Sequence, residues 1–161
     1  MNSQELYAVL VALEGDTLVL PNVAIAEVIS RERIQPAPQG GPVWLQGFVP
    51  FNGRRLHVLS FEALNGSSVP ELSRRSRVVV INSLGAHLDA GQFALVAQGY
   101  PHLVTLNRTG VRRANLHKTD RSDLVLSRLR IASQEAIIPD LESLELELSR
   151  IPVPEIQAAV A

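Results

Sequence analysis

Few residues in this 161-residue chain have types and spacings that could do chemistry. The chain has four histidines, His57, His87, His102 and His117, and their spacing is not that of metal ligands. It has no cysteine, which excludes disulfides, thiolate metal sites and cysteine nucleophiles. Glu27 and Glu62 could act as paired acids, but nothing in their spacing supports that role. Neither a phosphate-binding glycine loop nor a nucleophile elbow is present. We therefore predict a protein that is not an enzyme and that needs no metal or cofactor.

Charge and aromatic content narrow the binding functions that remain. Fifteen Lys and Arg residues against sixteen Asp and Glu leave a net charge of −1, which gives no overall attraction to nucleic acid or anionic lipid. Aromatic residues make up only 4% of the chain, whereas single-strand binders need aromatic platforms beside their charge. Residues 108–130 carry a local net charge of +5 and residues 135–161 one of −5. We expect these to be solvated surfaces that offset each other, with a docking face for an acidic partner as the alternative.

The elements that must position these residues are mostly short strands. With 46% hydrophobic and 19% charged residues, the chain has the composition of one globular domain. Apolar or β-branched runs between Gly, Pro and Asn predict nine or ten strands. Those runs span 6–13, 17–20, 43–49, 56–61, 77–82, 93–97, 102–106, 124–129 and 135–138. Residues 21–29 could form a helical turn or a strand, and 36–42 must form a loop because of their prolines and glycines.

Turn residues indicate how some of these strands are joined. Asn52-Gly53 suits a tight hairpin between the third and fourth runs. Residues 98–101 are expected to join 93–97 and 102–106 as a pair. Gly47 and Gly99 are expected to serve the backbone, through positive φ or close strand approach. Trp44 is expected in the core rather than at an interface.

The C-terminal part has a different pattern. Asp140 is a plausible N-cap, and Leu141, Leu144, Leu148 and Ile151 come after it at nearly helical spacing. Alternating leucines there also permit a strand, but the cap and the stop at Pro152 favour a short helix. Residues 152–161 are expected to form a tail.

One long stretch of sequence carries a family resemblance. The segment VAIAEVI at 23–29, a Pro-rich loop, and the hairpin strand HVLSF at 57–61 resemble the CheW-like domain of bacterial chemosensory systems. RVVVI at 77–81 and ALVAQG at 94–99 resemble later strands of that family. The resemblance covers residues 5 to 150, and the shorter, single-domain ChpC-like members of chemosensory pili systems are the variant most like this chain.

The resemblance implies a mainly β fold of two small five-stranded β-barrel subdomains with a short C-terminal helix, within a CheW-like domain at 1–151. It also implies a non-enzymatic adaptor that couples chemoreceptors to a CheA-type histidine kinase and controls type IV pilus motility. The partners would be the kinase regulatory domain, the cytoplasmic tip of a chemoreceptor, and other CheW-like proteins. The alternative function is a small β-barrel binding module for another ligand or nucleic acid.

Two segments are the candidate partner-binding residues under this resemblance. In the first, Ile25 and Val28 would supply apolar contact and Glu27 a charge that selects the partner. The alternative is that Ile25 and Val28 belong to the core. The second segment is the hairpin tip together with the start of the returning strand, and comprises Asn52, Gly53, Arg54 and Arg55. The family hairpin usually carries an arginine where this chain has Asn52, so Arg54 and Arg55 are expected to replace it.

The first residues bear on location. No Lys or Arg precedes Arg31, whereas a secretory signal needs a positively charged start. The run at 6–13 is also far shorter than the roughly 20 residues that span a bilayer. We therefore expect a cytoplasmic protein that does not insert into the membrane. The family resemblance implies recruitment to membrane-associated receptor arrays.

Overall fold

The computed structural model describes residues 5–154 and contains two six-stranded sheets. One sheet, here called the central sheet, has the order β3-β7-β8-β6-β5-β4. Its strands are β3 (Ile25–Ser30), β4 (Gln35–Pro36), β5 (Leu45–Phe51), β6 (Arg54–Leu59), β7 (Arg77–Asn82) and β8 (Gln92–Ala97). It is built entirely from the middle of the chain.

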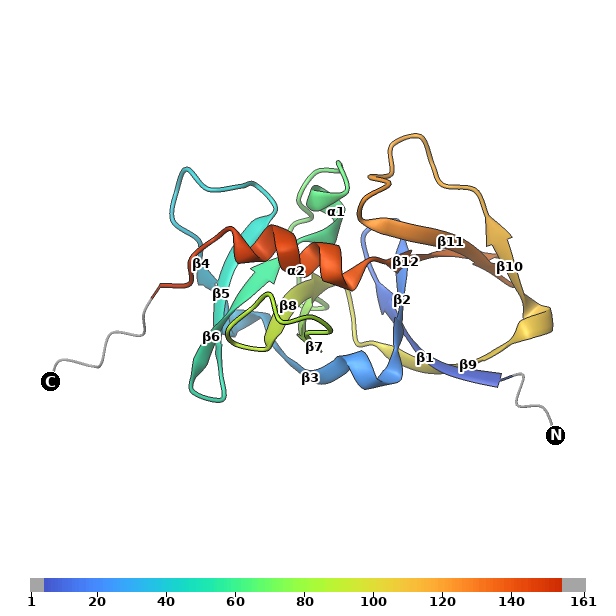
Figure 1. Ribbon diagram of the computed structural model, residues 1–161, viewed down its shortest axis with the longest axis horizontal. Helices are drawn as coiled ribbons and strands as arrows, with labels where there is room; N and C mark the ends of the chain where they lie inside the picture. The colour runs from blue at the N-terminus through green and yellow to red at the C-terminus, as the bar shows by residue number, and fades with distance from the viewer. Residues whose placement is uncertain (1–4, 155–161) are drawn as a thin grey trace, which may run out of the picture.

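The other sheet, here called the terminal sheet, combines both ends of the chain in the order β10-β11-β12-β2-β1-β9. Its strands are β1 (Glu5–Ala12), β2 (Thr17–Pro21), β9 (His102–Asn107), β10 (Val111–Ala114), β11 (Val125–Ile131) and β12 (Gln134–Pro139). The helices are α1 (Phe61–Leu64) and α2 (Leu141–Ser149), and short 3₁₀ turns lie at Asn22–Ala24, Arg31–Arg33 and Arg108–Gly110. Figure 1 shows the two sheets side by side, with α2 returning from the terminal sheet across the central one.

The expected mainly β fold with two subdomains and a short C-terminal helix is confirmed. Each sheet has six strands rather than five, because the two-residue β4 and the four-residue β10 add short edges that apolar patterning does not reveal. Asp140 is the N-cap of α2, since its Oδ1 accepts a hydrogen bond from the Ser143 amide at 3.2 Å.

Alternation along the strands divides their apolar side chains between two faces. On β7, Val79 and Ile81 join a core that both sheets share, whereas Val78 and Val80 face the interior of the central sheet. Because both faces are covered, the strand is apolar throughout, which explains its continuous hydrophobic run. The shared core also takes Leu18 of β2 and Leu144 of α2, and so joins the two subdomains.

Two expectations about turns and glycines were wrong. β8 and β9 do not pair, because β8 lies between β7 and β6 in the central sheet whereas β9 pairs with β1 in the terminal sheet. Residues 98–101 therefore cross between sheets. Gly99 has open space around its Cα and no positive φ, so nothing there requires a glycine.

Gly47 does have the backbone role expected of it. Its φ is 146°, and a Cβ at this position would collide with the Gln35 carbonyl of the adjacent β4. Trp44 is partly buried against the shared core, in line with the expected core position.

Within residues 5–154, no helix is long and apolar enough to cross a membrane.

Candidate interaction surfaces

The first predicted segment forms β3, an edge strand of the central sheet. Its pairing with β7 shifts between Ile25 and Glu27, so Ala26 is an extra residue in a β-bulge. Ile25 lies opposite Ile81 and Val28 opposite Val79, both of which face the shared core. The bulge thus brings Ile25 and Val28 onto one face, where both are partly buried. Ile25 packs against the shared core, as the core alternative expects, and no such contact is assigned to Val28.

Glu27 lies on the other face of β3. It pairs with Val80, whose side chain faces the interior of the central sheet, and it is exposed at the strand edge. The apolar pair and the charge therefore flank an edge instead of forming one flat patch. A partner must approach the edge itself to touch all three residues.

The second predicted segment is the β5–β6 hairpin. Asn52 and Gly53 have φ values of 49° and 78° and connect the paired residues Phe51 and Arg54. Positive φ at both central positions is the geometry of a type I′ turn, which suits the twist of a hairpin. The expected tight turn is present, and its tip is exposed.

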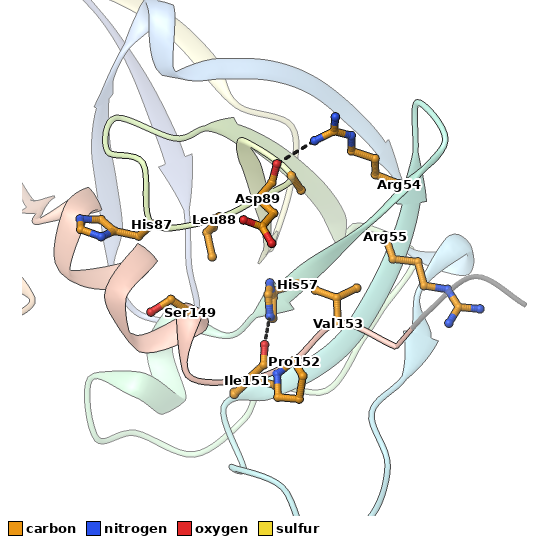
Figure 2. A pocket seen from close by; sticks show the side chains of 11 residues that line it. Arg54, Arg55, His57, His87, Leu88, Asp89, Ser149, Ile151, Pro152 and Val153 are labelled. Carbon is orange, nitrogen blue, oxygen red and sulfur yellow. Dashed lines mark hydrogen bonds between the residues drawn. The ribbon is translucent and has the colours of Figure 1, made fainter.

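Both arginines after the turn contact neighbouring loops. Arg54 donates through Nη1 to the Asp89 carbonyl at 2.7 Å, and Arg55 donates through Nη1 to the Pro154 carbonyl at 3.4 Å. Figure 2 shows Arg54 pointing to the loop that carries Asp89 and Arg55 pointing away from it. Each guanidinium is thus held near the surface of the hairpin by backbone oxygen.

A pocket of about 560 Å³ lies between this hairpin, the Asp89 loop and the segment after α2. Its floor includes His57, which is 4% exposed and donates from Nε2 to the Ile151 carbonyl at 2.7 Å. Desolvation by burial lowers the pKa of this imidazole below its ordinary value. A buried ring that donates to a backbone carbonyl has a structural role.

The same contacts show what part of the predicted C-terminal tail does. Residues 152 and 153 line the pocket, and Pro154 accepts the Arg55 hydrogen bond. This part of the tail therefore lies beside β6. The remaining tail residues, 155–161, lie outside the described part of the chain.

The two predicted segments do not form one site. β7 and β8 lie between β3 and β6 in the sheet, which separates the segments by three strand spacings, roughly 14 Å. The domain thus presents a bulged edge and a hairpin tip as separate surfaces.

Two buried carboxylates anchor loops through backbone amides, a role that the sequence does not indicate. Glu62 of α1 accepts from the Glu14 amide at 2.9 Å, which anchors the β1–β2 turn. Glu145 of α2 is fully buried and accepts from the amides of Leu84 and Gly85. Glu62 is therefore engaged with a backbone amide and is buried, whereas Glu27 is exposed on β3.

The basic segment at 108–130 contains an ion network that its composition does not predict. Arg128 is only 2% exposed and binds Asp120 through Nε at 2.6 Å and Nη2 at 2.8 Å. Its Nη2 also donates to Asp16 at 2.9 Å. These hydrogen bonds, with the charge of Arg128, hold the pKa of the Asp120 carboxyl far below its usual range. The expectation of a solvated surface was wrong for Arg128.

Other arginines of this segment are paired with acids. Arg121 binds Asp123 at 2.7 Å and Glu147 at 3.0 Å, and Arg130 binds Glu135 at 3.3 Å. The contacts to Glu147 and Glu135 join the basic segment to the acidic C-terminal one. This agrees with the expectation that the opposite charges of the two segments offset each other. This pairing leaves less free positive charge for a phosphate backbone and does not favour nucleic-acid binding.

No group of three or more His, Cys, Asp or Glu residues that could hold a metal occurs within residues 5–154.

Comparison with known proteins agrees with the two-sheet architecture. The crystal structure of the scaffolding protein TtCheW from Thermoanaerobacter tengcongensis is similar, with a TM-score of 0.71, 17% sequence identity and coverage of 86% of each chain. At that identity the similarity concerns the fold. No curated protein matches the sequence. The family model for the CheW-like domain matches residues 8–147, so this chain belongs to the CheW-like domain family.

Proposed function

We propose that the protein is a non-enzymatic chemosensory adaptor that couples chemoreceptors to a CheA-type histidine kinase. The observation that carries this proposal is the family match over residues 8–147, which spans both sheets. Its partners would be the regulatory domain of the kinase, the cytoplasmic tip of a receptor and other CheW-like proteins. It would act in the cytoplasm, at receptor arrays beside the membrane.

The separation of the two candidate surfaces supports a bridging role. The β3 edge offers Ile25, Glu27 and Val28, whereas the hairpin tip offers Asn52 and Gly53 with two arginines beside them. Two surfaces on one small domain allow two partners to bind at once. Repeated weak contacts of this kind gain avidity in an array without any single contact being strong.

The direct test is a calorimetric titration of the protein with the kinase regulatory domain and, separately, with the receptor tip. We expect Glu27→Lys to weaken binding of at least one partner by about tenfold, which corresponds to about 1.4 kcal/mol. The melting temperature should not fall, because Glu27 is exposed at a sheet edge.

Glu32→Lys is the matched control for this experiment. Glu32 is also exposed and lies five residues away in the 3₁₀ turn after β3, so its reversal makes the same change in net charge. Weaker binding in the Glu27 variant alone supports the β3 surface. A lower melting temperature with unchanged binding would rule that surface out, and no binding of the native protein to either partner would refute the adaptor.

The hairpin is tested by Arg54→Ala and Arg55→Ala in separate proteins. Each change removes a surface guanidinium and one hydrogen bond to a backbone carbonyl. We expect at least one variant to lose binding of a partner while it keeps the native circular dichroism spectrum. Unchanged binding in both would remove these arginines from the proposed site.

For the output, we propose control of type IV pilus motility, supported by the resemblance of the chain to ChpC-like members. Deletion of the gene in the native host should abolish or reduce twitching while flagellar swimming is retained. Loss of swimming alone would assign the adaptor to the other motility system.

A further inference from the structure

The four edges of the two sheets differ in how well they are protected against pairing with another strand. β4 is two residues long and includes Pro36, β3 contains the bulge and Glu27, and β10 is four residues long with Arg112 and Arg113. Short length, proline, charge and bulges are the features by which proteins block pairing at an exposed edge.

β9 has none of these features. It is six residues long, His102–Asn107, and contains no Lys, Arg, Asp, Glu or Pro. Its register with β1 runs from Leu10 opposite His102 to Glu5 opposite Asn107 without a shift. Within residues 5–154, β1 is the only strand that pairs with it.

Exposed apolar side chains lie beside this edge. Leu103 on β9 is 63% exposed and Tyr7 on β1 is 66% exposed. Tyr7 lies opposite Thr105, two residues along from Leu103, so the two side chains are diagonal neighbours on one face. The edge therefore has a regular register without Lys, Arg, Asp or Glu, and exposed apolar side chains lie beside it.

We propose that β9 pairs with β9 of a second copy of this chain, antiparallel, so that the terminal sheet continues across two molecules. This dimer does not depend on the proposed adaptor function. A second copy fits the edge because the strand has no Lys, Arg, Asp or Glu, so antiparallel self-pairing places no two of these charges opposite each other. A neutral edge also has no charge with which to select an acidic or basic foreign strand.

Symmetry defines the register. A twofold axis perpendicular to the sheet keeps each face continuous, so residues opposite one another must lie on the same face. Centring the axis on Val104 pairs residues 102–106, nearly the whole strand, and places Leu103 opposite Thr105 of the second copy. The two Leu103 side chains then become diagonal neighbours, whereas centring on Thr105 moves them out of reach.

The test is the mass of the full chain in solution, measured by sedimentation equilibrium from micromolar to near-millimolar concentration. One added strand pair is smaller than the roughly 1,200 Å² of a stable interface, so we expect a reversible, weak dimer. Leu103→Lys and Thr105→Glu should each weaken it by about tenfold or more, because each places a charge against the apolar edge.

Mixing the two variants tests the register itself. In the mixed dimer, Lys at position 103 of one copy would lie opposite Glu at position 105 of the other. The mixture should therefore associate more tightly than either variant alone, which a general loss of stability would not produce. Leu126→Lys is the matched control, since Leu126 is 60% exposed on β11, which three strands separate from β9 in the terminal sheet, and should leave the dimer intact.

A native chain that is monomeric at every concentration overturns the proposal, as does a dimer that survives Leu103→Lys. Monomeric native protein whose kinase-domain binding is lost in Leu103→Lys would instead assign the edge to a partner strand. A dimer weakened by both variants without recovery in the mixture would refute the register centred on Val104.

Discussion

The inner face of the central sheet packs a cluster of eight buried apolar side chains, among them Val49, Leu56 and Val78, whereas the corresponding cluster of the terminal sheet has four. Two of those four are alanines, and the apolar residues around them, such as Leu10 and Val104, are only partly buried. Equal numbers of strands thus enclose unequal interiors. The central sheet carries much of its own stabilisation, while the terminal sheet depends more on what joins it to its neighbour.

Two features make that junction. The shared core takes side chains from both sheets and both helices, and the Arg128 network lies at its border. Asp120 of this network also accepts a hydrogen bond from Asn65, the residue directly after α1. The central subdomain thus buries more apolar side chains of its own, whereas a buried ion network helps to join the terminal subdomain to it.

The largest expected effect is from Arg128→Met. Removing the guanidinium leaves Asp120 and Asp16 without their main partner in a site that is nearly closed to water, which costs about 3–5 kcal/mol. Denaturant unfolding measures the loss. Arg130→Met is the control, because Arg130 is exposed, and we expect a change below about 1 kcal/mol. Equal effects of the two variants would contradict a special role for the buried network.

Truncation of matched leucines compares the two interiors directly. Leu56 is 1% exposed inside the central sheet, and Leu56→Ala should cost about 3 kcal/mol through lost burial and a cavity. Leu10 is partly buried inside the terminal sheet, and Leu10→Ala should cost about 1 kcal/mol. Equal losses in denaturant unfolding would show that the two interiors are equivalent.

The smallest expected effect is the pH dependence due to His57 in the central sheet. Its pKa in the folded protein is lowered by desolvation from an ordinary value of 6.5, so the unfolded chain binds the proton more readily. This contribution to stability is complete above pH 6.5 and is lost as the pH falls through that value toward the folded pKa. His57→Gln should flatten the dependence of the unfolding free energy between about pH 7 and pH 5, and an unchanged slope would contradict this cause.

Strands that are buried on one or both faces could be predicted from the sequence, because their apolar side chains form runs or alternating patterns that indicate burial. The placement of β8 and β9 in different sheets could not be predicted, since neighbours along the chain usually pair and here the connection crosses between sheets. β10 was not predicted, because its sequence, VRRA, has two charged residues, as edge strands often do, and little apolar pattern. β3 remained ambiguous because its bulge breaks the alternation.

The candidate site was predictable only in part. The Asn52-Gly53 turn results from local backbone preference, and its geometry agrees with the prediction. The faces of β3 depend on a one-residue shift that composition does not encode. Asp16 and Arg128 are 112 residues apart, so nothing local in the sequence indicates that they meet. Partner binding at either surface stays a prediction until the titrations are made.

The parallel pairing of β2 with β12, through Leu18 and Ile137, has a consequence for synthesis of the chain. All strands of the central sheet have been synthesised once residue 97 has emerged from the ribosome. β2 cannot form its pairing with β12 until that strand, which begins at Gln134, has been made. At about 5–20 residues per second that delay is on the order of ten seconds. Throughout it, the β2 edge of the β1–β2 hairpin is open, and the β1 edge is open as well until β9 (His102–Asn107) has been made. The nascent chain is therefore most in need of chaperones at the β1–β2 hairpin, long after that segment has left the exit tunnel.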